Sequence, residues 1–202
     1  MNKDRAASEV LLRQAEECGC LSVFVTVDQP TPGKREADER VKADASTMIR
    51  TPNGAAAKND SKGSSLGRTM AGFIDSSLNW EDLKWLRKAT KLPIVLKGVQ
   101  TAEDAVLAAD RGVDGIIVGN HGGRSLDTST PAVLVLLELR MTCPDIFERI
   151  DIFLDGGIRR GTDIFKALCL GAKAVGMGRS FLYAANYGPE GVEKLTESTF
   201  RF

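Results

Sequence analysis

The sequence predicts an α/β protein built on a parallel sheet, arranged either as a doubly wound sheet or as part of an eight-stranded (β/α) barrel. Short apolar, β-branched runs alternate along the chain with amphipathic helical stretches, and several of these stretches end at a glycine just before the next apolar run. Runs of this composition are typical of strands buried on both faces, as in parallel sheets. Helices are therefore expected outside the sheet.

Five strands and the helices between them follow in chain order. The strands are expected at residues 21–28, 93–97, 115–119, 152–155 and 174–177, and the helices at 6–18, 79–90, 101–112, 133–140, 162–170 and 191–202. Asn79 is predicted to cap the second helix, and Thr101 with Asp104 to form a capping box at the third. A complete barrel usually has eight strands in ~250 residues. If the fold is a barrel, the chain carries about strands 4 to 8, and the first strands are missing.

Charge and composition exclude several kinds of partner. Lys and Arg together number 27, as do Asp and Glu, so no global field draws the 202-residue chain to nucleic acid or to an acidic membrane. No apolar run approaches the ~20 residues of a membrane span. The four cysteines lack the paired spacing of a metal site. We therefore expect a soluble intracellular protein with reduced thiols, and mitochondrion, peroxisome and cytoplasm stay open as compartments.

Residues 31–71 differ in kind from the rest of the chain. They are rich in Lys, Ser, Gly, Asn and Asp and have almost no apolar periodicity after Val41. Loops of this length in compact proteins are usually lids, binding loops or disordered segments, and the residues do not decide between a lid and plain disorder. We expect one domain over residues 1–202, interrupted by this mobile loop.

Chemically reactive side chains stand where the predicted strands end. Asp28, Lys97, His121 and Asp155 each follow or close an apolar run, and the carboxyl ends of parallel strands are where α/β proteins place their active sites. Polar residues that merely mark the point where a strand meets solvent would explain one or two of them. Four different functional types indicate a common site.

Two glycine-rich turns follow the last two strands. Residues 155–161 read Asp-Gly-Gly-Ile-Arg-Arg-Gly, and residues 176–179 read Gly-Met-Gly-Arg. Glycines let backbone N–H groups approach a phosphate, the following helix N-terminus adds a partial positive charge, and Arg159 or Arg179 can neutralise the remaining charge. Either turn alone is ordinary, but together they predict a ligand that carries a phosphate group.

His121 is the only histidine, and it stands in the run Asn-His-Gly-Gly-Arg that ends at Arg124. A lone histidine is usually structural, but the glycines leave space beside this one, which favours a general base. Asp28 could orient the imidazole and stabilise its protonated form. Arg124 could hold a substrate carboxylate by a bidentate fork. The alternative for Arg124 is a surface salt bridge with Asp127.

These residues resemble those of the FMN-dependent 2-hydroxy-acid dehydrogenases and oxidases, a family that includes glycolate oxidase and the lactate dehydrogenase of the flavocytochrome type. The resemblance covers essentially the whole chain and rests on six ordered blocks, at residues 24–28, 33–38, 92–99, 120–124, 155–161 and 176–179. It implies part of a (β/α)8 TIM barrel, FMN as cofactor, and oxidation of an (S)-2-hydroxy acid, lactate-like or glycolate-like, to a 2-oxo acid. For the full-length family it leaves a homo-oligomer open.

The resemblance also implies roles for single residues. His121 would be the catalytic proton acceptor, paired with Asp28. Arg124 would bind the substrate carboxylate, assisted by Arg35 from the loop. The residues that bind the cofactor would be Thr26 and Lys97 at the flavin ring, Gly157, Arg159, Gly178 and Arg179 at its phosphate, and also Asp155 and Gly156.

The chain departs from the family pattern in two ways, which leave alternatives open. Gly119 stands where the family usually has a serine that helps to hold the flavin. The family's first three strands, with a tyrosine that helps to bind substrate, precede the matching region, so we expect a fragment that folds poorly alone or a part completed by another chain. A phosphate-site barrel enzyme without redox chemistry would keep the glycine turns without needing His121 and Arg124. A non-catalytic remnant that binds a nucleotide or a partner protein is the third alternative.

Overall fold

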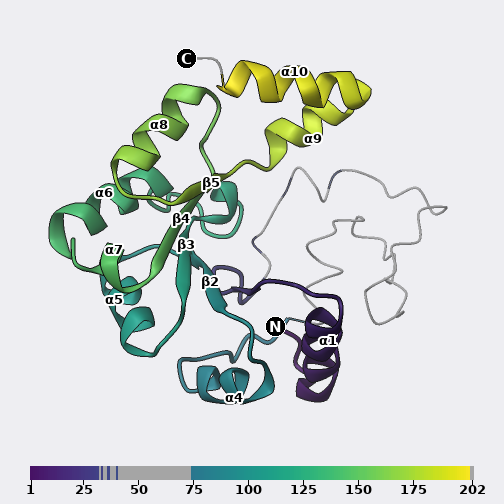
Figure 1. Ribbon diagram of the computed structural model, residues 1–202, viewed down its shortest axis with the longest axis vertical. Helices are drawn as coiled ribbons and strands as arrows, with labels where there is room; N and C mark the ends of the chain where they lie inside the picture. The colour runs from purple at the N-terminus through teal and green to yellow at the C-terminus, as the bar shows by residue number, and fades with distance from the viewer. Residues whose placement is uncertain (32, 34–35, 37–39, 41–73, 201–202) are drawn as a thin grey trace. The chain divides into compact units, whose positions relative to one another are not determined.

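The computed structural model describes residues 1–31, 33, 36, 40 and 74–200 (Figure 1). The chain divides into two compact units: one comprises Met1–Val23 and Gln29–Leu92, and the other comprises Phe24–Asp28 and Pro93–Phe202. Most of the predicted loop at 31–71 lies outside the described residues, and so does Arg35.

Two helices, joined by polar contacts, are the main elements in the described part of the first unit. Helix α1 spans Arg5–Glu17 and helix α4 spans Asp82–Ala89. The indole N–H of Trp85 donates to Glu9 Oε1 at 3.0 Å, and the hydroxyl of Thr90 donates to Glu16 Oε1 at 2.6 Å. These two hydrogen bonds join α1 to α4 and to the residue that follows it.

The start of α4 differs from the prediction, which placed it at Asn79. The regular helix begins three residues later, at Asp82. Asn79 nevertheless makes the contacts of a cap, because its side chain accepts the N–H of Glu81 and its own N–H donates to the Asp82 carboxylate. Asn79 therefore caps the turn before α4, whereas the residue at the N-cap of the regular helix, Glu81, makes no side-chain cap.

The second unit is an α/β assembly around a sheet whose strand order follows the chain, β1-β2-β3-β4-β5. The pairs β2–β3, β3–β4 and β4–β5 are parallel. The strands are β1 (Val23–Thr26), β2 (Ile94–Val99), β3 (Gly115–Val118), β4 (Asp151–Asp155) and β5 (Ala174–Gly176). The helical elements are α5 (Ala102–Asp110), η1 (His121–Gly123), α6 (Ala132–Thr142), α7 (Ile146–Arg149), α8 (Gly161–Cys169), α9 (Arg179–Ala185) and α10 (Gly188–Phe200).

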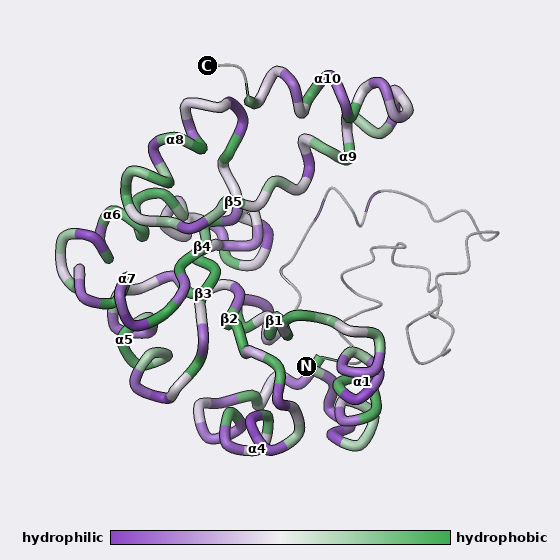
Figure 2. The backbone as a smooth tube through the Cα atoms, viewed as in Figure 1, coloured by the Kyte–Doolittle hydropathy of each residue, from purple (hydrophilic) through white to green (hydrophobic). Residues whose placement is uncertain are grey.

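The central strands β2, β3 and β4 carry the core, and helices α5 to α8 cover one face of the sheet (Figure 1). Hydrophobic residues concentrate along β3 and β4 (Figure 2), and all four residues of β3 are buried. The largest fully buried side chains of this unit are those of Ile94, Ile116, Val118, Val135, Leu136, Leu139, Ile146, Ile152 and Leu154. This core gives the carboxyl ends of the strands a rigid support.

The prediction that residues 21–28 form a strand buried on both faces is wrong for most of that run. Leu21 is 87% exposed and Phe24 is 55% exposed, and only Val25 is buried within β1. The reason is position, since β1 is at one edge of the described sheet and has a single neighbour, β2. β5 is at the other edge. The described sheet is therefore open, whereas a closed barrel has no such edges.

Some helix ends lie where the sequence predicts them, and others do not. Thr101 accepts the N–H of Asp104 at 3.1 Å, which confirms Thr101 as the cap of α5, one half of the predicted capping box. The single helix expected at 191–202 is instead the longer α10, preceded by α9, and the four-residue helix α7 is too short to show a period. In the described part of the chain, no helix is long and apolar enough to cross a membrane.

Candidate active site

A cavity of about 510 Å³ lies where the strands of the second unit end. It brings together the predicted residues from β1, β2, β3, β4 and β5, with the exception of Asp28, which lies behind His121. Its lining residues are Thr26, Lys97, His121, Gly122, Arg124, Asp155, Gly156, Gly157, Ile158, Arg159, Gly176, Met177, Gly178, Arg179, Ser180 and Tyr183. The expectation of one common site is therefore met.

His121 is held by a buried carboxylate. Its Nδ1 lies 3.0 Å from Oδ1 of Asp28, whose side chain is fully buried while the imidazole is 22% exposed. A carboxylate can only accept here, so Nδ1 carries the hydrogen and Nε2 keeps a free lone pair. The other Asp28 oxygen, Oδ2, is buried without a hydrogen-bond partner among the described residues. The pair thus has the orientation needed for a histidine that accepts a proton.

The turn that carries the histidine has an unusual backbone. Residues 121–123 have φ values of +58°, +67° and +72°, and at His121 this left-handed conformation is uncommon for a residue with a side chain. Two neighbours hold the turn: Asn120 Oδ1 accepts the N–H of Gly123 at 3.1 Å, and Arg124 Nε donates to the carbonyl of His121 at 3.0 Å. Strain of this kind, about 1–3 kcal/mol, persists where the surroundings impose it and clusters at active sites.

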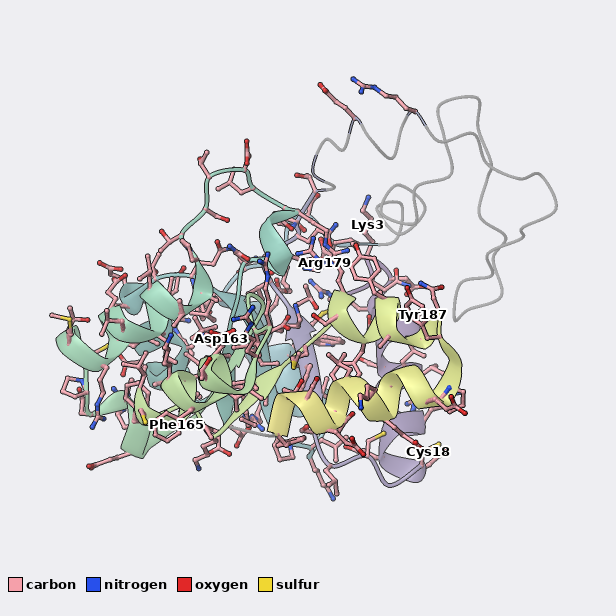
Figure 3. All side chains as sticks on the ribbon, turned by 90° about the horizontal axis from the view of Figure 1, so that it is seen from above. Lys3, Cys18, Asp163, Phe165, Arg179 and Tyr187 are labelled. Carbon is pink, nitrogen blue, oxygen red and sulfur yellow. The ribbon has the colours of Figure 1, made fainter. Side chains whose placement is uncertain are left out.

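Arg179 reaches the same turn from the other side of the cavity. Its guanidinium donates to the carbonyl of Gly122 at 2.9 Å, and Figure 3 labels it at the start of α9. A Cβ at Gly122 would lie 2.6 Å from Arg179 Nη2, so the glycine makes this approach possible. Arg179 therefore links the turn after β5 to the turn after β3.

Arg124 lines the cavity and does not form the surface salt bridge considered as its alternative. The carboxylate of Asp127 accepts the N–H of Thr128, and these two described residues, Arg124 and Asp127, form no ion pair. Among the described residues, only Nε of Arg124 is engaged, by the His121 carbonyl. The two terminal nitrogens remain available to bind an anion in the cavity.

Lys97 has an anionic partner, as its position at the end of a central strand requires. Its Nζ lies 3.5 Å from Oδ2 of Asp155, and both side chains are about three-quarters buried. Room for the carboxylate comes from Gly176, where a Cβ would lie 2.9 Å from Asp155 Oδ1. Gly119 is also confined, since a Cβ there would lie 3.1 Å from the Asp155 carbonyl oxygen. A serine at this position would require β3 or β4 to shift slightly.

The two glycine turns line the cavity, and the first of them contains a cap that the sequence did not predict. The backbone N–H groups of Arg159 and Arg160 both donate to Asp163 Oδ2, at 3.1 Å each. These donors at the start of α8 are therefore satisfied by a side chain of the same turn. Gly156, Gly157 and Gly178 and the Arg159 side chain remain at the cavity wall. The prediction did not include Asp163. Its position could have indicated the cap, because an acid at the third position of a helix is typical of an N-terminal cap.

The cavity is cationic overall. Lys97, Arg124, Arg159 and Arg179 line it, against the single lining carboxylate of Asp155. Within the described residues, no cluster of three or more side chains could hold a metal ion. Sheet and site together define an α/β protein with a ligand cavity for an anion at the carboxyl ends of parallel strands.

Comparison with known proteins gives the family. A sequence profile for FMN-dependent dehydrogenases matches residues 1–199. The chain is 46% identical over 197 residues to an L-lactate dehydrogenase (cytochrome) of Wickerhamomyces anomalus, and 43% identical over 198 residues to a peroxisomal (S)-2-hydroxyacid oxidase of Arabidopsis thaliana. This chain belongs to the FMN-dependent dehydrogenase family.

Solved structures agree with the assignment. A flavocytochrome b2 variant with pyruvate bound superposes with a TM-score of 0.79 at 44% identity, covering 98% of this chain and 46% of that one. A mandelate oxidase superposes with a TM-score of 0.80 at 36% identity, covering 98% and 54%. The matches cover 96% of this chain but 34% of the lactate dehydrogenase and 53% of the plant oxidase. The five strands are thus part of the TIM barrel of this family, as predicted.

Proposed function

We propose that this site oxidises an (S)-2-hydroxy acid to a 2-oxo acid with FMN as cofactor. The observation that carries the proposal is the His121 imidazole, held by buried Asp28 in a cavity that also contains Arg124. By their names, the relatives include an L-lactate dehydrogenase and an (S)-2-hydroxyacid oxidase, and one structural neighbour holds pyruvate, a 2-oxo acid. Because the chain spans a third to a half of these relatives, the activity of the whole protein is part of the proposal.

The residues present fit FMN. A cavity of about 510 Å³ lies within the range of cofactor pockets, ~300–1,000 Å³. When bound, FMN supplies the two-electron acceptor that oxidation of an alcohol carbon to a ketone requires. Lys97 and Thr26 would lie at the ring, with Asp155 orienting the lysine. The phosphate would be held by Arg159, Arg179 and the glycine turns that contain Gly156, Gly157 and Gly178.

The remaining chemistry is proton transfer and orientation. Arg124, with Arg35 from the loop, would hold the substrate carboxylate and so present the hydroxyl-bearing carbon to the imidazole. His121 would accept the substrate proton at Nε2, because Nδ1 already donates to Asp28. The imidazolium that forms would be stabilised by the Asp28 carboxylate, which burial keeps in a poorly screened environment.

Anaerobic reduction tests the proposal. We expect L-lactate or glycolate to bleach the FMN-loaded chain, and His121→Gln to slow the bleaching about 10²-fold or more while FMN affinity stays unchanged. Asp127→Asn is the matched control, because Asp127 neighbours Arg124 in sequence but does not line the cavity. Loss of FMN from His121→Gln would assign the histidine to cofactor binding instead. Failure of the unaltered chain to bind FMN would remove the cofactor from the proposal.

A further inference from the structure

Gly98 lies in β2 at a break in the register of the sheet. Lys97 is opposite Ile117 of β3, but Val99 is opposite Val118, so Gly98 is an extra residue with no partner in β3. Its φ is +106°, and it is buried. It does not line the cavity, and although it belongs to the block at residues 92–99, the sequence predicted no role for it.

The space beside Gly98 is filled by Asp28. A Cβ at position 98 would lie 2.4 Å from both Cβ and Cγ of Asp28 and 2.7 Å from its Oδ2. Side-chain carbons essentially never approach another heavy atom within 3.0 Å, so one of the two groups would have to move. The unpartnered Oδ2 of Asp28 thus packs against the one residue of β2 that has no side chain.

Neither backbone is free to relieve such a clash. The N–H of Val27 donates to the carbonyl of Lys97 at 2.9 Å, which ties the residue before Asp28 to the residue before Gly98. The side chain of Asp28 is fully buried and lies against His121. A methyl group at position 98 would therefore displace the carboxylate from the imidazole rather than move the strands apart.

We propose that Gly98 is a positioning residue for the acid–base pair, because the side chain it lacks leaves the space from which Asp28 orients His121. The catalytic consequence rests on the proposed function, but the structural consequence does not. With the carboxylate displaced, Nδ1 of His121 loses the acceptor that holds its hydrogen there. The neutral ring then exchanges between its two tautomers, and Nε2 is no longer always the free base.

The tautomer of His121 can be observed directly. Because the chain contains one histidine, imidazole ¹⁵N resonances of the full chain need no assignment among several rings. At a pH where the ring is neutral, we expect the unaltered chain to show the tautomer with hydrogen on Nδ1. Gly98→Ala should give a mixture of tautomers, and so should Asp28→Asn. The double variant should match Asp28→Asn alone, because both changes act through the same carboxylate.

Gly171 provides the matched control. Its φ is also +106°, and a Cβ there would lie 2.7 Å from the ring of Phe147, away from the cavity. Gly171→Ala should therefore lose stability through the same backbone strain and a similar clash, yet keep the tautomer of the unaltered chain. In the FMN-loaded chain, Gly98→Ala should slow bleaching by the same factor as Asp28→Asn, about 10²-fold, and Gly171→Ala should not.

The outcomes separate a positioning role from a purely structural one. If Gly98→Ala and Gly171→Ala lose similar stability and both keep the original tautomer, the proposal is wrong. If Gly98→Ala does not fold, Asp28→Gly combined with it removes the clashing atoms and should restore a cooperative melt. Failure of that pair to fold would also overturn the proposal. Because the tautomer is read without FMN or substrate, its result stands even if the proposed oxidation fails.

Discussion

Lys97 and Asp155 face each other across the end of β3, with Nζ and Oδ2 3.5 Å apart. Strand β4 begins and ends with an aspartate, and each is paired: Asp155 with Lys97 and Asp151 with Lys173. The pair at the cavity leaves each side chain about one-quarter exposed, whereas the pair at the opposite end of β4 is about half exposed. The cavity pair is therefore less screened, and its lysine is the one positioned to act on a ligand.

We expect Lys97→Met to weaken FMN binding about tenfold, the usual effect of losing one hydrogen bond to a charged group. A fluorescence titration of FMN measures the change. Lys173→Met is the control, because it breaks the equivalent ion pair at the other end of β4 and should leave FMN affinity unaltered. Equal losses in both variants would point to a general effect on the sheet.

Arg159 should distinguish a flavin that carries a phosphate from one that does not. We expect Arg159→Gln to lower FMN affinity about 10- to 100-fold while riboflavin affinity stays the same, because the guanidinium acts on the phosphate alone. Arg160→Gln, one residue along and outside the cavity lining, should change neither. A matching loss of riboflavin affinity would place Arg159 at the ring and contradict its assignment to the phosphate.

Asp163 should matter for stability, because it accepts two backbone N–H groups at the start of α8. Losing such a cap costs about 1 kcal/mol, which corresponds to a fall of about 2–4 °C in Tm for a chain of this size. We expect this fall for Asp163→Ala in a thermal melt, and a smaller one for Asp163→Asn, which keeps one acceptor. No change in either variant would show that water replaces the cap at no cost.

Glu16 should make the first unit sensitive to acid. The hydroxyl of Thr90, and secondarily the N–H of Lys91, hold the pKa of Glu16 below its ordinary value by hydrogen bonding to the carboxylate. A lowered pKa stabilises the fold fully above the ordinary glutamate pKa of about 4.3, and this stability is lost as pH falls through the lowered value.

We therefore expect Glu16→Gln to flatten the dependence of unfolding on pH in that acidic range. Tryptophan fluorescence reads this unit specifically, because both tryptophans, Trp80 and Trp85, belong to it. Glu17→Gln removes the same charge one residue along and is the control. If both variants unfold with the same pH dependence, the hydrogen bond from Thr90 contributes nothing to acid stability.

Much of the site could be predicted because parallel strands align their carboxyl ends. Lys97, His121 and Asp155 each follow an apolar run, and a parallel sheet brings such positions to one edge wherever the strands are adjacent. The glycine turns were visible for the same reason. Strand periodicity predicts the direction and the order of the strands in the sheet. These two properties are sufficient to place the residues around one cavity.

Other features depend on contacts that a linear pattern does not contain. The role of Gly98 appears only when Asp28, from another strand, occupies the space beside it. The cap that Asp163 provides for the N–H groups of Arg159 and Arg160 was not predicted, because it depends on a contact within the turn. Phe24 is exposed because it lies in an edge strand, although the composition of residues 21–28 is that of a buried strand.

The Asp28–His121 contact spans 93 positions of the chain, and Phe24–Asp28 joins the second unit although Gln29–Leu92, which follows it, belongs to the first. Closing a loop of that length costs about 3–4 kcal/mol of chain entropy before any contact repays it. Contacts of such high order slow folding. The Asp28–His121 contact should therefore be among the last features of the second unit to form. A ligand that binds only when this contact is formed also shifts the folding equilibrium towards the folded unit.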